Sequence, residues 1–382
     1  MPLNQDIVDL TRFIVRYDLL NPSGAGTAPI GRVKDWTAFV ALAEEHRIGA
    51  LSHAVLAGTG AELPAEAASA LARIRERHTL LNLARAAELL RVLSAFQAAM
   101  IEAMPFKGVV LSAQIYGDCT LRAAGDLDLF IRWEDLRRAT EIVLARGYRL
   151  TTPLRPDGRP AWDGSFEYRF ERPSDGMVLE FHWQLDFVHR GFRHSIGLDW
   201  IGDHWQMVRL AGGEVRAPNA EKMLLLLCMH GSKHRWSRLN WVCDVAQSLR
   251  TSPDLDWDRI NAEAKQVGLR KAVALGLMLA EAICGVTGHK TVIRKLDSFP
   301  FVRGVAGTLA RDCIEHPGQG FKGILPYHAR LQDRQDLLRF VFSLKMLRPT
   351  DRDEEFLPLP PALRWIHVLI RPFRLLVDRS AR

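Results

Sequence analysis

Two aspartates, Asp126 and Asp128, lie one residue apart in the apolar segment 125–131, which reads GDLDLFI. The apolar alternation predicts a β-strand, and residues two apart in a strand point to the same face. Two carboxylates held side by side repel each other, and burial adds the cost of removing water from both charges. The arrangement becomes favourable when divalent cations bind between the side chains, so the segment predicts a metal site.

A third carboxylate is expected from a neighbouring strand. Residues 166–185 read as a β-hairpin around a Pro-Ser-Asp-Gly turn, and Glu180 shares one face of its second strand with His182 and Gln184. Three carboxylates around two Mg²⁺ ions suit nucleotidyl transfer from a nucleoside triphosphate. Two acids would hold the metal ions, and the third would share a metal ion and accept the proton of an attacking hydroxyl group.

The chain divides into four regions by its residue patterns. A helix with Asp35 as its N-cap is expected over residues 35–56, and residues 65–103 predict one long helix or two abutting helices because they lack Pro and Gly. Asn219 is the expected N-cap of a later helix. The four regions are an N-terminal helical region (1–104), an α/β core (105–217), a C-terminal helical domain (218–348) and a Pro-rich connector with a basic amphipathic tail (349–382).

The length, composition, cysteine pattern and net charge limit the classes of protein to which this chain can belong. The length of 382 residues favours two or three domains or subdomains, and 48% apolar with 25% charged residues is an ordinary soluble composition. The five cysteines are scattered and form no C-x-x-C pair, which argues against a disulfide framework and favours the reducing cytoplasm. We expect no signal peptide and no transmembrane segment. The net charge of +7 mildly favours an anionic partner, and oligomeric state stays open.

Several motifs together resemble a known family. A Gly-containing loop, a short helix and then D-x-D on a strand resemble the nucleotidyltransferase superfamily of the DNA polymerase β type. More narrowly, KG…IYGD…LR…GDLDLFI, LEFHWQL, HGSKHRWSRLNWVCDVA and PTDRDEEFLPLP resemble the bacterial family of uncharacterised nucleotidyltransferases, over about residues 35–376. Some members of that family are encoded beside peptide-modification genes, including those of lasso peptides. The resemblance implies that Asp126 and Asp128 are metal ligands and that Glu180 is the third acid.

These patterns and the resemblance predict an α+β fold, in which a small mixed β-sheet forms a nucleotidyltransferase core between two helical regions. The loop departs from the superfamily, because Lys107-Gly108-Val109 replaces the usual Gly-Ser or Gly-Gly and residues 109–125 form a longer spacer. Phosphate binding is therefore expected to rest on backbone N–H groups at the helix start, near Gly108, and on Lys107. Lys107 and Arg122 can each balance triphosphate charge or pair with the acids.

The segment 229–241 carries further candidates. His230 and His234 lie four residues apart, but the Glu of H-E-x-x-H is absent, so a zinc hydrolase is not expected. Either Lys233, His234 and Arg235 line the nucleotide cleft, or they form a polar helix end. Asp244 can orient one of these cations or form a plain salt bridge.

Other aromatic and basic residues have two interpretations each. His182 can orient Glu180, contact the acceptor or be a core histidine. A tryptophan can stack on a base or belong to the core, and the basic tail can contact nucleic acid or a membrane surface or cover its own domain. The residues concerned are Trp183, Trp236 and Trp241, and, in the tail, Arg364, Arg371, Arg374, Arg379 and Arg382.

Three functions fit these observations. The favoured one is Mg²⁺-dependent transfer of a nucleoside monophosphate from a nucleoside triphosphate, with ATP among the candidates, to a hydroxyl or phosphate group of a small molecule or peptide, as in natural product modification. A tRNA-directed, toxin-like nucleotidyltransferase is the second, and it predicts RNA binding that weakens steeply with salt. A non-catalytic interaction protein on the same fold is the third.

Overall fold

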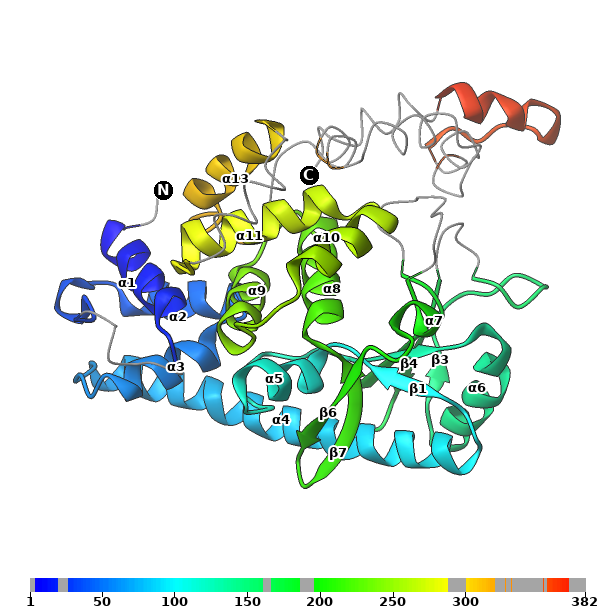
Figure 1. Ribbon diagram of the computed structural model, residues 1–382, viewed down its shortest axis with the longest axis horizontal. Helices are drawn as coiled ribbons and strands as arrows, with labels where there is room; N and C mark the ends of the chain where they lie inside the picture. The colour runs from blue at the N-terminus through cyan, green and yellow to red at the C-terminus, as the bar shows by residue number, and fades with distance from the viewer. Residues whose placement is uncertain are drawn as a thin grey trace.

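The computed structural model describes residues 4–19, 27–160, 166–185, 196–287, 300–319, 327, 331, 353 and 356–370. Figure 1 shows helices gathered above and to one side of a small sheet, with one long helix running beneath both. Most of the basic tail, residues 371–382, lies outside the described residues. Among the described residues, no helix combines the length and the apolar character needed to cross a membrane.

The N-terminal helices are α1 (Gln5–Arg16), α2 (Trp36–Glu45), α3 (Gly49–Gly58) and α4 (Ala65–Ala98), with a short 3₁₀ turn η2 (Ile30–Arg32) before α2. The Asp35 carboxylate accepts a hydrogen bond of 2.8 Å from the Ala38 N–H, which confirms the predicted N-cap. The single helix expected over residues 35–56 is wrong, because the chain turns between α2 and α3 with Arg47 at φ 57°. The long helix α4 is continuous.

A mixed five-stranded sheet forms the α/β core, as predicted. Its order is β1-β2-β5-β4-β3, and only β2 and β5 are parallel. The β4–β5 pair is the predicted hairpin, and Asp128 of β2 lies directly opposite Glu180 of β5. The strands are β1 (Ala103–Pro105), β2 (Leu127–Ile131), β3 (Arg149–Leu150), β4 (Glu167–Arg172) and β5 (Met177–His182).

Short helices and a second hairpin surround this sheet. Helix α5 (Gly108–Tyr116) connects β1 to the aspartate segment, and the 3₁₀ turn η3 (Trp133–Asp135) leads from β2 into α6 (Leu136–Ala145). Further along the chain come α7 (Leu198–Ile201) and the separate two-stranded sheet of β6 (Trp205–Leu210) and β7 (Gly213–Pro218).

The C-terminal helices begin with α8 (Ala220–Lys233), whose predicted N-cap is confirmed because the Asn219 side chain accepts a hydrogen bond of 3.1 Å from the Lys222 N–H. They continue as α9 (Leu239–Thr251), α10 (Trp257–Gln266), α11 (Arg270–Cys284) and α13 (Pro300–Asp312), and a 3₁₀ segment η4 (Pro361–Ile366) follows later. All five cysteines are free thiols, in agreement with the expectation that disulfides do not support the fold.

Two apolar cores hold these elements together. One core joins α1–α3 and the start of α4 to the C-terminal helices, and the other packs the five-stranded sheet against the second half of α4 and the β6–β7 hairpin. The N-terminal and C-terminal helices therefore share a core although the sheet region separates them in the chain. The predicted α+β class is correct; the four-part division of the chain stays a prediction.

Candidate active site

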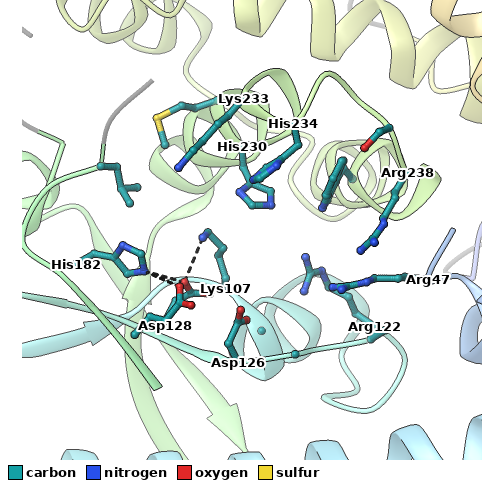
Figure 2. A pocket seen from close by; sticks show the side chains of 18 of the residues that line it. Arg47, Lys107, Arg122, Asp126, Asp128, His182, His230, Lys233, His234 and Arg238 are labelled. Carbon is teal, nitrogen blue, oxygen red and sulfur yellow. Dashed lines mark hydrogen bonds and ion pairs between the residues drawn. The ribbon is translucent and has the colours of Figure 1, made fainter. Parts of the chain in front are cut away.

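The predicted carboxylates line one cavity of about 510 Å³ between the sheet and helices α8 and α9. Asp128 projects from β2, Glu180 from the adjacent position of β5, and Asp126 from the residue before β2. Figure 2 shows the helical side chains facing these acids across the cavity. The charged and aromatic lining residues are Arg47, Lys107, Arg122, Asp126, Asp128, Glu167, Glu180, His182, His230, Lys233, His234, Arg238 and Trp241.

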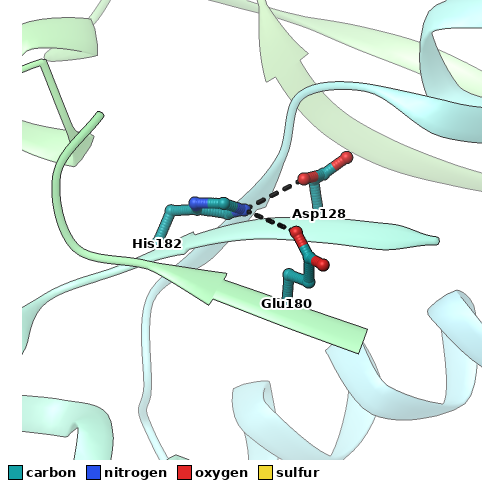
Figure 3. A group of neighbouring side chains, drawn as sticks. All are labelled: Asp128, Glu180 and His182. Atoms are coloured by element: carbon teal, nitrogen blue, oxygen red, sulfur yellow. Dashed lines mark hydrogen bonds and ion pairs between the residues drawn. The ribbon is translucent and has the colours of Figure 1, made fainter. Parts of the chain in front are cut away.

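Asp128, Glu180 and His182 form the tightest group of possible metal ligands among the described residues, with one ligand atom of each lying within 4.8 Å of the others (Figure 3). The Nε2 atom of His182 lies 2.9 Å from Asp128 Oδ1 and 3.6 Å from Glu180 Oε2. Its Nδ1 atom lies 3.4 Å from a carboxylate oxygen of Glu167. His182 is thus surrounded by carboxylates, which supports the predicted interpretation that it orients Glu180.

Because the acids lie close together, their pKa values shift in opposite directions. Burial opposes ionisation of Asp128, but Lys107 and the hydrogen bond from His182 outweigh it, so the pKa of Asp128 lies well below its usual range. The charge of Asp128, together with burial, raises the pKa of Asp126 to about 6. Burial would lower the pKa of His182, but hydrogen bonds to Asp128 and Glu180 raise it to about 9. The positive charge of His182 therefore partly offsets the repulsion between the carboxylates.

Lys107 and Gly108 lie where the chain enters α5. The Lys107 ammonium group is 3.2 Å from Asp128 Oδ1, so it makes the predicted ion pair while also lining the cavity. Gly108 has φ +60°, and a Cβ atom at this position would lie 3.0 Å from the backbone oxygen of Asp126. A glycine is needed here because other residues rarely adopt this conformation and because the two backbone segments pass so close together. The first N–H groups of α5 thus begin beside the aspartates.

Arg122 is held from the helical side of the site. Its Nε atom donates to both carboxylate oxygens of Asp244 on α9, at 3.0 and 2.8 Å, and both side chains are buried. Asp244 therefore forms the predicted salt bridge, but its partner is Arg122 and not a cation of α8. Of the two interpretations of Arg122, pairing with the aspartates of the D-x-D motif is not found, and the interpretation that it balances triphosphate charge stays a prediction; Arg122 still lines the cavity.

The end of α8 supplies the opposite wall. Lys233, His234 and His230 line the cavity, and Arg235 is not among the described lining residues. Nucleotide binding by Lys233 and His234 stays a prediction. Burial and the neighbouring Lys233 lower the pKa of His234 to about 4, so this ring is neutral at pH 7. The His234 and Trp241 rings lie 5.1 Å apart, inclined at 30°. They form an aromatic surface on the cavity wall.

The three tryptophans have different environments. Trp241 lines the cavity, so it keeps both of its predicted interpretations. Trp236 has no exposed surface, and its ring fills the space beside Gly231, so base stacking by Trp236 is wrong and the core interpretation holds. Trp183 packs edge to face against Trp133 and Tyr168 in an aromatic cluster beside the sheet.

Three charged lining residues were not among the predicted candidates: Arg47, Glu167 and Arg238. Glu167 of β4 is the cross-strand partner of His182 of β5. The alternation of the hairpin strands in the sequence could therefore have indicated that Glu167 lies beside His182. Arg47 and Arg238 reach the cavity only through the packing of the helices. No local sequence pattern marks them.

Comparisons with known proteins bear on this site. A family model described as "Uncharacterised nucleotidyltransferase" matches residues 32–285, more than half of the chain and all of the lining residues named above. The solution structure of the antibiotic-resistance factor ANT(2'')-Ia is similar over 50% of this chain and 95% of that one, with 13% sequence identity and a TM-score of 0.37. No curated protein matches the sequence.

Proposed function

This chain belongs to the family of uncharacterised nucleotidyltransferases, and we propose that it transfers a nucleoside monophosphate from a nucleoside triphosphate, with Mg²⁺, to a hydroxyl or phosphate group of a small molecule or peptide. One observation supports this most strongly. Carboxylates from two adjacent strands and cations from the helices line opposite walls of a single cavity. Such a cavity suits a divalent cation and a polyphosphate bound together.

The donor set fits Mg²⁺. Asp126, Asp128 and Glu180 offer hard carboxylate oxygens, the ligands that Mg²⁺ prefers. We assign His182 the role of orienting Asp128 and Glu180, because its Nε2 atom already contacts both carboxylates. When bound, the cation would supply charge neutralisation for the triphosphate and for the oxygens of the reacting phosphoryl group.

The charges lining the cavity also favour this substrate. Outside the Arg122–Asp244 pair, four carboxylates (Asp126, Asp128, Glu167 and Glu180) face four side chains with permanent positive charge (Arg47, Lys107, Lys233 and Arg238) among the described lining residues. With the positive charge of His182 added, the lining carries a small excess of positive charge. A nucleoside triphosphate carrying about four negative charges, bound with one or two divalent cations, would bring the cavity close to charge balance.

The chain's own groups can carry the transfer. In the proposed step, the acceptor oxygen forms a bond to the α-phosphorus, and the bond from that phosphorus to the bridging oxygen of the diphosphate breaks. The acceptor proton passes to Glu180, which is ionised because hydrogen bonding from His182 outweighs burial and holds its pKa below the usual value. The diphosphate leaves with the electron pair, and cationic side chains that line the cavity, Lys107 and Lys233 among them, stabilise its charge.

Glu180, the proposed proton acceptor, and Glu167 both line the cavity beside His182, so the attacking group of the acceptor would lie near two carboxylates. These carboxylates would repel a phosphate backbone, which supports a small molecule or a peptide over RNA as the acceptor. Peptide modification, as in the lasso-peptide setting of the resembling family, stays a prediction. The preferred base also stays open, with ATP among the candidates.

The test follows the label from α-³²P-labelled ATP, GTP, CTP or UTP into pools of small molecules, peptides or RNA, with and without Mg²⁺. We expect Mg²⁺-dependent transfer by the wild-type protein, and loss of transfer in Asp126→Asn and Asp128→Asn. The exposed Asp199 provides the control variant Asp199→Asn, which should stay active. Absence of transfer from all four nucleotides, or full activity of Asp128→Asn, would contradict the proposal. Label in the RNA pool alone would favour the tRNA-directed alternative.

A further inference from the structure

Three guanidinium groups gather at one end of the cavity. Figure 2 shows Arg47, Arg122 and Arg238 on one side of Asp126, with His182 on the other side. The charges of Arg238, Asp126 and Arg122 each act on Arg47, so each of these groups lies within electrostatic reach of Arg47. The cavity therefore has two different ends, one built around the His182 carboxylate group and one built from arginines.

Arg47 reaches the cavity because the α2–α3 turn is fastened to the start of α9. The buried His46 ring lies 3.0 Å from the Ile314 carbonyl oxygen through Nε2, and its Nδ1 accepts a hydrogen bond of 3.2 Å from the Leu239 N–H. The Asn240 N–H donates to the His46 carbonyl oxygen at 3.3 Å. These contacts cap the first turn of α9, whose own N-cap residue, Arg238, makes no side-chain cap.

The same contacts therefore position two arginines. Arg238 immediately precedes the capped turn, and Arg47 immediately follows His46. Arg47 also holds φ 57°, a left-handed conformation that costs a non-glycine residue about 1–2 kcal/mol. A strained residue kept in place by its surroundings, with its side chain in a cavity, is typical of a functional position.

These two arginines are not paired within the described part of the chain, although the charge of Asp126 acts on Arg47. Arg122 is neutralised by Asp244, but neither Arg47 nor Arg238 forms an ion pair with a carboxylate of the described residues. Neighbouring guanidinium groups repel each other unless an anion binds between them. Their planar donor geometry suits phosphate oxygens in particular.

We propose that Arg47 and Arg238, beside the Arg122–Asp244 pair, bind the terminal phosphates of the nucleoside triphosphate, and that the acceptor enters from the His182 end. This inference rests on the proposed function. In an in-line transfer, the acceptor and the leaving diphosphate lie on opposite sides of the α-phosphorus. Glu180, the proposed proton acceptor, lies next to His182, so the diphosphate extends towards the arginines. The N-terminal helices thus complete the nucleotide site.

The test is calorimetric titration in the presence of Mg²⁺ with three probes: inorganic pyrophosphate, the four nucleoside triphosphates as α,β-methylene analogues, and the matching nucleoside monophosphates. The variants are Arg47→Gln, Arg47→Lys and Arg238→Gln, with thermal unfolding as the check on folding. Arg77, an exposed residue of α4 paired with Glu44, provides the control Arg77→Gln.

We expect Arg47→Gln and Arg238→Gln each to weaken pyrophosphate and triphosphate binding by at least about tenfold, because hydrogen bonds to charged groups are lost. Monophosphate binding should stay unchanged, Arg47→Lys should recover part of the affinity, and Arg77→Gln should behave as the wild type. Wild-type affinities in both glutamine variants would overturn this inference alone, as would equal weakening of all three probes. A wild-type protein that binds no triphosphate would overturn the proposed function as well.

Discussion

The buried pair between Arg122 and Asp244 makes the stability of the site region testable. The Arg122 side chain is 9% exposed and the Asp244 side chain 1%, and two hydrogen bonds of 3.0 and 2.8 Å join them. Asp244→Asn keeps the size of the side chain but leaves the guanidinium charge buried without its counter-ion. Removing one partner of such a pair costs about 3–5 kcal/mol. We expect the low end, about 3 kcal/mol, because Asn retains one hydrogen-bond acceptor.

The assay is urea-induced unfolding of the full-length protein. The double variant Arg122→Met/Asp244→Asn should be more stable than Asp244→Asn alone, because it removes the unpaired buried charge. The exposed pair of Arg137 and Glu141 on α6 is the control, and Glu141→Gln should cost less than about 1 kcal/mol. A loss below 1 kcal/mol in Asp244→Asn, or a double variant less stable than that single variant, would refute the reasoning.

Two further predictions concern the start of α5 and the pH dependence of stability. Gly108→Ala and Gly117→Ala should each lower the free energy of unfolding by about 1–2 kcal/mol, because both positions have a left-handed backbone conformation. Only Gly108→Ala should also weaken triphosphate binding in calorimetry, because its new methyl group would meet the Asp126 backbone oxygen. Equal triphosphate binding by the two variants would be inconsistent with this reasoning. Burial lowers the pKa of His46 to about 4, so the folded protein keeps this ring neutral while the unfolded chain takes up a proton below about pH 6.5. The stability that the neutral His46 ring contributes is therefore fully present above pH 6.5 and falls by about 3 kcal/mol towards pH 4. In urea titrations, the difference in unfolding free energy between the wild type and His46→Gln should shrink over that pH range. A constant difference would argue against a neutral buried ring.

The carboxylate half of the site follows from strand periodicity. Residues two apart share a face, so Asp126 and Asp128 could be paired from the sequence, and the hairpin pattern placed Glu180 and His182 on one face of a neighbouring strand. The register that sets Asp128 opposite Glu180 then brought these groups together in the structure. Such local rules are strong because each depends on only a few neighbouring residues.

The cationic half depends on packing between distant segments. Arg47 meets the cavity because His46 contacts Leu239, and Arg122 is fixed by Asp244, in both cases across more than a hundred residues of chain. Periodicity and capping rules contain no information on such contacts. The break between α2 and α3 involves contacts of the same kind, since the ring and the carbonyl group of His46 accept hydrogen bonds from Leu239 and Asn240 at the start of α9.

The central claim is that the carboxylates of the cavity bind a nucleoside triphosphate through a divalent cation. The most direct measurement is calorimetric titration of the wild-type protein and of Asp128→Asn with the α,β-methylene triphosphates, with Mg²⁺ and with EDTA. The account predicts Mg²⁺-dependent binding of at least one nucleotide by the wild type and its loss in Asp128→Asn. Binding that is equally tight in EDTA, or unchanged in Asp128→Asn, would contradict the account.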